Sequence, residues 1–493
     1  MTGMAQPKLD ELPEIFRPED SKWASRQAEN GHIRKIARGL FTTNLDEPLD
    51  QLVRRSWYDV AAIRFPKAVI VDRSAVDGQP GSDGSLFLDV GPRKSNPAAV
   101  EYPGLRIRPR SGPGMMPGDI QFAGLYQSSE PRIALDNLRP SRARSGIRRT
   151  LDRDDLERWL DRLARTRGSD ELNRIRDEAR SLSKNLGAER EFKELDRLIG
   201  SMLGTRDGEL VTGEATARGR GQAFDSVRLN RFEILRAELA KQEFAQRSAT
   251  GDPNRLGAFF EAYFSNWIEG TEFEVEEAED IVFRGIIPSQ RPKDAHDIQG
   301  TFDAVTSRRF LNPPEDFDAL LDYLREANRR ILVSRPEKSP GEFKTVANRA
   351  GSTSFVAPDL VLGTLSEGFK VRELIKPGLP RAIFSMFLIS EVHPFTDGNG
   401  RVSRLLMNAE LSALRLTRII VPSVYRDEYM NALRGLSHND NAVAIWRMLD
   451  RAQDWSSRLN WPTMKVAMDQ LRASNAFVTP AEADERGVRL QDP

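Results

Sequence analysis

The sequence lacks cysteine, an excess of charge of one sign, and any long apolar run. Without cysteine it can form neither disulfides nor thiolate metal sites, and it has no cysteine nucleophile. Lys+Arg and Asp+Glu both number 73, so no net charge draws the chain to nucleic acid or to an anionic membrane. No apolar run approaches the roughly 20 residues that span a bilayer, and the first residues form no apolar signal core. We therefore expect a soluble, cytoplasmic protein without a membrane partner.

The length and the apolar content of the chain suffice for several domains. The chain has 493 residues, of which 39% are hydrophobic and 30% charged, which predicts two or three folded domains. Short apolar runs and Gly/Pro breaks precede about residue 220, and long helical patterns follow. The expected fold is α+β and multidomain: a small module at 1–85, an α/β accessory region and linker at 86–220, an all-α domain at 221–475, and a tail at 476–493.

The most informative stretch runs from His393 to Arg404 and lies between two apolar helical patterns. Gly398 and Gly400 permit close backbone approach, and the N-terminus of the following helix favours phosphate. The residues predicted to form this phosphate site are Asp397, Gly398, Asn399, Gly400, Arg401 and Arg404. Both arginines can hold phosphate with a planar fork of donors, and Asp397 offers Mg²⁺ a hard oxygen ligand. His393, with an ordinary pKa of about 6.5, suits a general base. The stretch thus predicts an anion site with a base beside it.

This stretch resembles the signature of the Fic family, H-x-F-x-[DE]-G-N-G-R-x-x-R, and meets every fixed position. The resemblance implies an all-α domain that transfers AMP from ATP to a Ser, Thr or Tyr hydroxyl of a protein, the enzyme itself included. It also implies that His393 deprotonates the hydroxyl, Asp397 positions Mg²⁺, residues 398–400 cradle the α- and β-phosphates, and Arg404 binds the γ-phosphate. A Gly-rich loop with surface arginines is the plain alternative.

Nucleotide preference rests on a smaller set of residues. A phosphate-transferring branch of the family carries Lys where this chain has Gly400, so the resemblance favours AMP; transfer of another nucleotide stays open. Residues 341–358 resemble the family's flap, a β-hairpin that clamps the target by strand addition. Its residues Ala350, Gly351, Ser352 and Thr353 would face the nucleotide, and an ordinary surface hairpin is the alternative. Tyr429 and Met430 would line the adenine pocket, although core positions on an amphipathic helix explain them equally well.

The segment from Ser265 to Gly270 resembles the family's inhibitory signature, [S/T]-x-x-x-E-[G/N]. The resemblance implies that Glu269 pairs with Arg404 and blocks the γ-phosphate, so we expect the resting enzyme to be autoinhibited. The alternative is a solvated glutamate in an acidic run. His296 and His438 lack the spacing of metal ligands and are expected to be structural.

The N-terminal region suggests a different function. Residues 31–44 resemble the β-wing of a winged helix, and residues 10–140 loosely resemble AbiEi-type antitoxins, which are transcriptional regulators. Lys and Arg side chains in two clusters would then contact DNA phosphates: Arg34, Lys35 and Arg38, and Arg139, Arg142, Arg144, Arg148 and Arg149. An antitoxin-like regulator fused to a Fic toxin is the alternative function. A basic face on a recognition or homodimerisation module remains open, because residues 14–30 hold too few apolar positions to predict a recognition helix.

Overall fold

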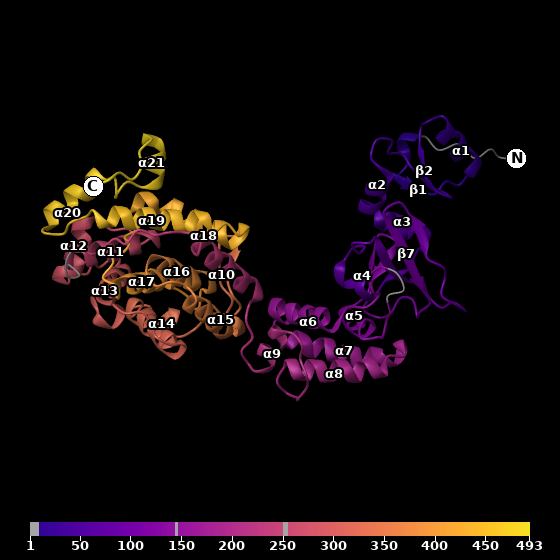
Figure 1. Ribbon diagram of the computed structural model, residues 1–493, viewed down its shortest axis with the longest axis horizontal. Coiled ribbons are helices and arrows are strands. Elements are labelled where there is room, and N and C mark those ends of the chain that lie inside the picture. The colour runs from indigo at the N-terminus through magenta and orange to yellow at the C-terminus, as the bar shows by residue number, and fades with distance from the viewer. Residues whose placement is uncertain (1–8, 143–145, 250–254) are drawn as a thin grey trace. The chain divides into compact units, whose positions relative to one another are not determined.

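The computed structural model describes residues 9–142, 146–249 and 255–493. The chain forms two compact units, residues 1–221 and 222–493 (Figure 1). The first unit combines two sheets with helices, and the second is helical apart from one small hairpin. None of the helices in the described ranges is long and apolar enough to cross a membrane.

The first unit begins with a three-stranded sheet in the order β1-β3-β2. Its elements are η1 (Leu9–Glu11), β1 (Ile15–Phe16), α1 (Ser21–Glu29), β2 (Arg34–Ala37) and β3 (Leu40–Thr42). Hairpin β2–β3 occupies the expected wing. Helix α1 lies within residues 14–30, where the sequence has too few apolar positions to predict a recognition helix. Asp20 caps it by accepting from the N–H groups of Lys22 and Trp23, and only Trp23 and Ala24 are buried. The hydrogen bonds of this N-cap stabilise a helix that buries few apolar side chains.

A six-stranded mixed sheet follows, in the order β6-β7-β5-β4-β9-β8. Its strands are β4 (Val69–Ile70), β5 (Ser85–Asp89), β6 (Val100–Tyr102), β7 (Leu105–Arg110), β8 (Ile120–Phe122) and β9 (Leu125–Gln127). Every residue of β5 is buried, and β5 runs parallel to β7. The expected module boundary at 85/86 therefore falls inside a central strand.

Nine helices accompany this sheet in the described part of the first unit, α1 included. The others are α2 (Leu49–Arg55), α3 (Trp57–Arg64), α4 (Asp72–Asp77), α5 (Glu130–Asn137), α6 (Arg153–Arg167), α7 (Asp170–Leu186), α8 (Glu189–Met202) and α9 (Gly213–Gly219). The apolar faces of α6, α7 and α8 share one core with the sheet, which includes Leu88, Ile107, Leu160 and Ile175. The first unit is therefore held by a single main core.

The second unit is a bundle of helices around α16 (Leu379–Val392). The others are α10 (Ser226–Leu239), α11 (Arg255–Ile268), α12 (Val275–Arg284), α13 (Pro292–Thr306), η2 (Arg308–Phe310), α14 (Phe317–Ile331), η3 (Pro336–Lys338), η4 (Pro358–Leu360), α15 (Val361–Glu373), α17 (Asn399–Ser412), η5 (Ser423–Tyr425), α18 (Arg426–Asn439), α19 (Val443–Ser457), α20 (Met464–Ala473) and α21 (Pro480–Arg486).

Helix α16 is the centre of this bundle because it is apolar on all sides. Eleven of its residues are buried, and it packs against α10, α15, α17 and α19. The expected C-terminal tail contributes to the same core through Ala476, Ala483 and Leu490. The loop that leaves α16 is consequently anchored to the most rigid part of the unit.

Candidate active site

The loop between α16 and α17 is fixed by local hydrogen bonds. His393 adopts a left-handed conformation (φ 54°) at the end of α16, and Gly398 (φ 78°) is the N-cap residue that precedes α17. The Asn399 side chain closes the loop: its Oδ1 accepts from the Phe395 N–H and its Nδ2 donates to the Phe395 carbonyl, both at 2.9 Å. Phe395 is 1% exposed and packs against Phe343. The motif is therefore a preorganised turn with a buried aromatic anchor.

His393 is held in the form that a general base requires. Its Nδ1 lies 3.3 Å from the Ser390 carbonyl, which can only accept, so we assign the proton to Nδ1 and the free lone pair to Nε2. Burial lowers the pKa of His393 to about 4; the hydrogen bond to Ser390 opposes this, the nearby Lys344 adds to it, and Glu269 and Asp397 also oppose it. The imidazole is thus neutral at pH 7.

The start of α17 presents the features of an anion site. The first N–H groups of a helix have no partner within the helix, and its dipole favours negative charge there. A Cβ on Gly400 would lie 2.1 Å from Glu269 Oε1, so glycine is the residue that lets this carboxylate approach the helix end. Asp397 stands beside it with its side chain 39% exposed, while its Oδ1 accepts from the Gly398 N–H at 2.6 Å. The loop therefore offers both anion donors and an accessible carboxylate.

Arg404 is held by the two residues of the inhibitory signature. Its Nε donates to Ser265 Oγ at 3.0 Å, and its Nη2 donates to the Ser265 carbonyl at 2.9 Å and to Glu269 Oε1 at 2.7 Å. Burial raises the pKa of Glu269, but Arg404 and Arg401 outweigh it and hold that pKa below its ordinary value. The structure thus brings Ser265, Glu269 and Arg404 together, with Glu269 charged at neutral pH.

Arg401 is directed toward a carboxylate that the sequence did not single out. Its Nη1 lies 3.1 Å from Asp297 Oδ2 and donates to Asn266 Oδ1 at 3.2 Å. Asp297, on α13, also accepts from Arg335 and is 2% exposed. Asp297 precedes Arg401 by 104 positions in the chain, so no local pattern in the sequence could reveal this partner.

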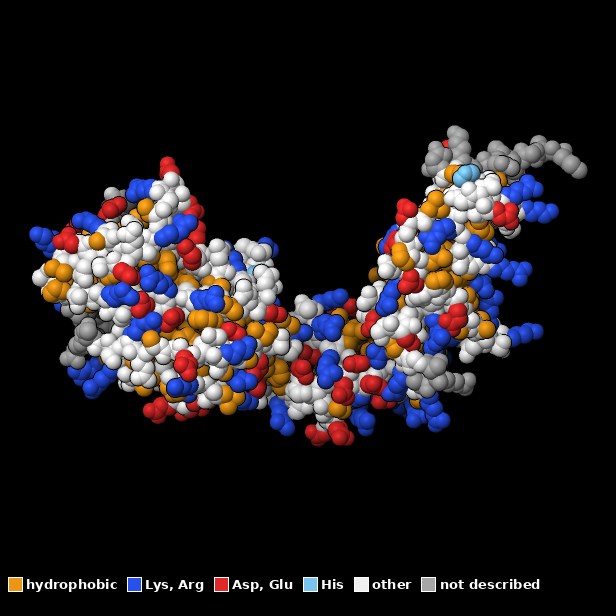
Figure 2. Space-filling view, turned by 45° about the horizontal axis from the view of Figure 1, so that its top comes forward, with side chains coloured by type: hydrophobic (Ala, Val, Ile, Leu, Met, Phe, Trp, Pro, Cys, Tyr) orange, Lys and Arg blue, Asp and Glu red, His pale blue; other side chains and the backbone are white. Residues whose placement is uncertain are grey.

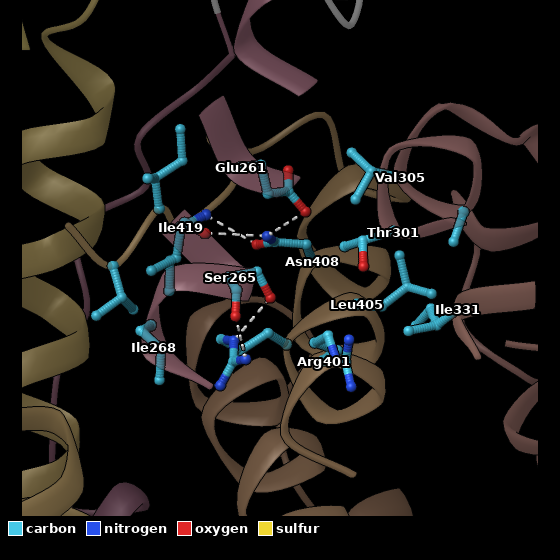
Figure 3. Close-up of a pocket in the computed structure, with 14 residues that line it drawn as sticks. Glu261, Ser265, Ile268, Thr301, Val305, Ile331, Arg401, Leu405, Asn408 and Ile419 are labelled. Atoms are coloured by element: carbon cyan, nitrogen blue, oxygen red, sulfur yellow. Dashed lines mark hydrogen bonds between the residues drawn. The ribbon is translucent and has the colours of Figure 1, made fainter. Parts of the chain in front are cut away.

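A small cavity lies behind the two motif arginines. Its volume is about 10 Å³, and Ser265, Arg401 and Arg404 contribute to its lining. Figure 3 shows Glu261 and Asn408 directed toward one another at its far side, where Asn408 Nδ2 donates to Glu261 Oε1 at 2.9 Å. Such a volume suits about one water molecule and is far too small for a nucleotide. This cavity is therefore not itself a nucleotide site.

The segment expected to be the flap forms a hairpin. Strands β10 (Arg349–Ala350) and β11 (Thr353–Ser354) pair antiparallel, with Gly351 at φ 58° and Ser352 exposed in the turn. Thr353 Oγ1 lies 2.7 Å from His438 Nε2, so this histidine anchors the hairpin. His296 is half-buried on α13.

The two residues expected at the adenine differ in exposure. Tyr429 is 1% exposed, and its hydroxyl donates to Met386 Sδ at 3.3 Å, while its ring lies 5.8 Å from the Arg404 guanidinium carbon. Met430 is half-buried and packs against the core. The position of Tyr429 agrees with the alternative of a core aromatic that supports Arg404.

The donors around Asp397 suit a magnesium ion only when a ligand supplies the rest. Within the described residues, no group of three or more His, Asp or Glu is placed to hold a metal. Magnesium is commonly bound through one or two carboxylates together with substrate phosphates. The carboxylate of Asp397 is 39% exposed beside the anion site, with Lys338 and Arg401 each 3.8 Å away, and as one carboxylate it fits that arrangement.

A neutral histidine, a partly exposed carboxylate and a helix N-terminus lie together on one loop of a helical bundle. Residues 317–411 match the family model described as the Fic/DOC family. This part of the chain is therefore similar to Fic/DOC domains, and the helical architecture of the second unit is the one the sequence predicted.

Curated relatives are similar over part of their length. "Protein adenylyltransferase fic-1" of Caenorhabditis briggsae is 28% identical over 220 residues, which are 43% of this chain and 42% of that protein. Its Caenorhabditis elegans counterpart is 26% identical over 237 residues, 46% of each chain. The chain thus spans about half the length of the curated relatives it matches. Among solved structures, "Fic-1 (aa134 - 508) from C. elegans" has a TM-score of 0.37 and 21% identity, covering 64% of this chain and 99% of that one.

Proposed function

We propose that this protein is an adenylyltransferase that moves AMP from ATP to a hydroxyl side chain of a protein. The observation that carries the proposal is the neutral His393 and the anion site of α17 on one rigid loop, with every position of the motif in place. The names of the curated relatives support the same activity.

In the proposed reaction, the acceptor hydroxyl gives its proton to His393 Nε2 while its oxygen attacks the α-phosphorus of ATP in line. The bond from the α-phosphorus to the bridging oxygen breaks, and pyrophosphate leaves with that oxygen. The first N–H groups of α17 and the guanidinium of Arg404 stabilise the charge on the phosphates. Asp397 would hold Mg²⁺, which supplies further neutralisation of phosphate charge when bound.

We also propose that Glu269 keeps the resting protein inactive. Its carboxylate takes the Nη2 donor of Arg404, which the γ-phosphate would need, and places negative charge at the end of α17. Two anions cannot share this position without strong repulsion.

The acceptor is proposed to be a Ser, Thr or Tyr of another protein, or of this chain, presented along hairpin β10–β11.

The activity is tested by label transfer from ATP carrying ³²P at the α- or the γ-phosphate, with Mg²⁺ and cell lysate. The variants are Glu269→Gly, the control Glu272→Gly, and Glu269→Gly/His393→Ala. Glu272 is exposed and three residues from Glu269. Label from the α-position alone, strong only in Glu269→Gly, supports AMP transfer. Label from the γ-position contradicts it.

A second candidate function is DNA binding by the first unit. Hairpin β2–β3 exposes Lys35 and Arg38, and Figure 2 shows basic side chains along one border of this unit. Other members of the predicted clusters are engaged within the protein: Arg34, Arg139, Arg148 and Arg149 bond to carbonyls or carboxylates, and Arg144 lies outside the described residues. Salt-dependent binding to duplex DNA of its own promoter, weakened by Lys35→Ala/Arg38→Ala, would support this candidate.

A further inference from the structure

An aromatic ring covers one face of the candidate base. The rings of Phe355 and His393 are stacked with centroids 3.7 Å apart and an interplanar angle of 7°. Phe355 follows directly after β11, and its N–H donates to the Asn348 carbonyl at 3.2 Å. A face-to-face stack leaves the imidazole little freedom to tilt and helps to bury it. Phe355 therefore restricts the orientation of His393.

A buried lysine lies beside the same pair of rings. Lys344 is 4% exposed, its Nζ donates to Asn348 Oδ1 at 2.7 Å and to the Val392 carbonyl at 3.4 Å, and it lies 5.9 Å from the Phe355 ring centroid. No carboxylate in the described ranges forms an ion pair with it. Burial lowers the pKa of Lys344 to about 7. Keeping such a group away from water and countercharge is costly, so its position calls for an explanation.

Asn348 connects this lysine to the catalytic loop. Its Nδ2 donates to the Phe395 carbonyl at 2.9 Å, while the backbone N–H of Lys344 donates to the Pro394 carbonyl at 2.9 Å. The segment that leads into the hairpin is thus bonded to the two residues that follow His393. A change in Lys344 or Phe355 would be transmitted to the imidazole through these few contacts.

We propose that Phe355 and Lys344 are positioning residues for the general base: Phe355 fixes the plane of the His393 ring, and Lys344 fixes Asn348 and with it the loop below that ring. This rests on the proposed role of His393 as the base. The charged groups that face His393 are Lys344, Glu269 and Asp397. In a Glu269→Gly protein, Lys344 and Asp397 remain as the charged groups that affect the pKa of His393.

The positioning is tested first by NMR, without any assay of activity. The full chain holds four histidines, so the Cε1–H signal of His393 is identified by its absence in His393→Ala. We expect an upfield ring-current shift and a titration near pH 4. Phe355→Leu should move the signal downfield and raise the pKa, Phe355→Tyr should preserve both, and the control Phe343→Leu, which loses the ring packed on Phe395, should leave the ring-current shift in place. An unchanged His393 signal in Phe355→Leu overturns the proposal.

Kinetics in a Glu269→Gly background give the second test. Phe355→Leu should lower kcat roughly tenfold with little change in the KM for ATP, because orientation of the base and not nucleotide binding is lost. Lys344→Met should move the acid limb of the kcat profile to higher pH, because removal of a nearby cation raises the pKa of His393, and Lys344→Arg should restore it. Full activity and an unshifted profile in both variants contradict the proposal. If the parent transfers no label, the proposed function fails, while the NMR result still decides the positioning.

Discussion

Each unit buries an arginine that pairs with carboxylates, but the partners of Arg132 and of Arg404 differ in exposure. In the first unit, Arg132 is fully buried and donates to Asp89 and Asp119, whose side chains are equally inaccessible. In the second, Arg404 is buried at the start of α17, but its acidic partner Glu269 is 34% exposed. A fully enclosed ion pair has no access to a competing ligand, whereas an exposed carboxylate can be displaced by another anion. The comparison separates an arginine whose carboxylate partners are enclosed from one whose carboxylate partner solvent anions can reach.

The second unit also buries two titratable groups that form no ion pair in the described residues. His393 and Lys344 are buried in the second unit and have pKa values lowered by burial to about 4 and about 7. Such perturbed groups cluster at functional sites, because a packed interior gains nothing from them. The following predictions test this difference between the units.

The largest expected effect is the loss of transfer in His393→Ala. Removal of a general base typically lowers the rate by a factor of about 10²–10⁴. In a Glu269→Gly background, label transfer from α-³²P-ATP should fall by this factor, while the melting temperature stays within a few degrees. Retention of transfer in this variant would show that His393 is not the base.

Arg132→Leu should destabilise the first unit strongly and leave the site intact. Removal of one partner from a buried ion pair leaves Asp89 and Asp119 uncompensated and costs about 3–5 kcal/mol. Denaturant unfolding of the full chain, followed by tryptophan fluorescence, should show a lower midpoint for one transition. An Arg404→Leu protein serves as the comparison: we expect a smaller loss of stability and a loss of ATP binding. Equal destabilisation by both changes would show that Arg132 and Arg404 contribute to stability in the same way.

Glu269→Gly should raise transfer by a factor of roughly 5–150, the usual range for coupling between an inhibitory contact and a ligand. The free Arg404 should also bind ATP more tightly, which isothermal titration calorimetry measures directly. The control Glu272→Gly should behave as wild type in both assays. No gain in either assay would mean that the contact between Glu269 and Arg404 is structural.

The smallest expected effect is that of pH on inhibition. The pKa of Glu269 is lowered and that of Arg404 is raised, so the pair stays charged above the ordinary pKa of the carboxyl and is lost only as the pH falls through the lowered value. The ratio of Glu269→Gly to wild-type transfer should therefore be constant from about pH 5 to pH 8. If this ratio falls toward one between pH 5 and pH 8, a change of pH releases the inhibition.

The sequence revealed those parts of the site whose residues are close together in the chain. The motif lies within twelve residues, so its loop, its candidate base and its candidate anion site could be predicted from local chemistry. The contacts of Arg401 with Asp297, and of His393 with Phe355, join segments far apart in the chain, and no periodicity or spacing indicates them. They depend on how the helices pack, which the sequence pattern does not specify.

In the fold, too, the sequence predicts local features better than those that depend on contacts between distant segments. The apolar pattern of residues 381–392 predicts a central buried helix, and α16 is that helix. Helix α1 escaped prediction because a cap and two buried side chains suffice for it once hairpin β2–β3 covers its apolar side. The short strands around residue 85 contain too few residues for their alternation to define a module boundary, and pairing with β7 decides their place.

Mass spectrometry of the acceptor protein tests the central claim most directly. The Glu269→Gly protein, incubated with ATP and Mg²⁺, should add the mass of one AMP unit to a Ser, Thr or Tyr side chain, either on itself or on a lysate protein. The Glu269→Gly/His393→Ala protein should add none. A phosphate adduct, or an AMP adduct that persists without His393, would contradict AMP transfer by this base.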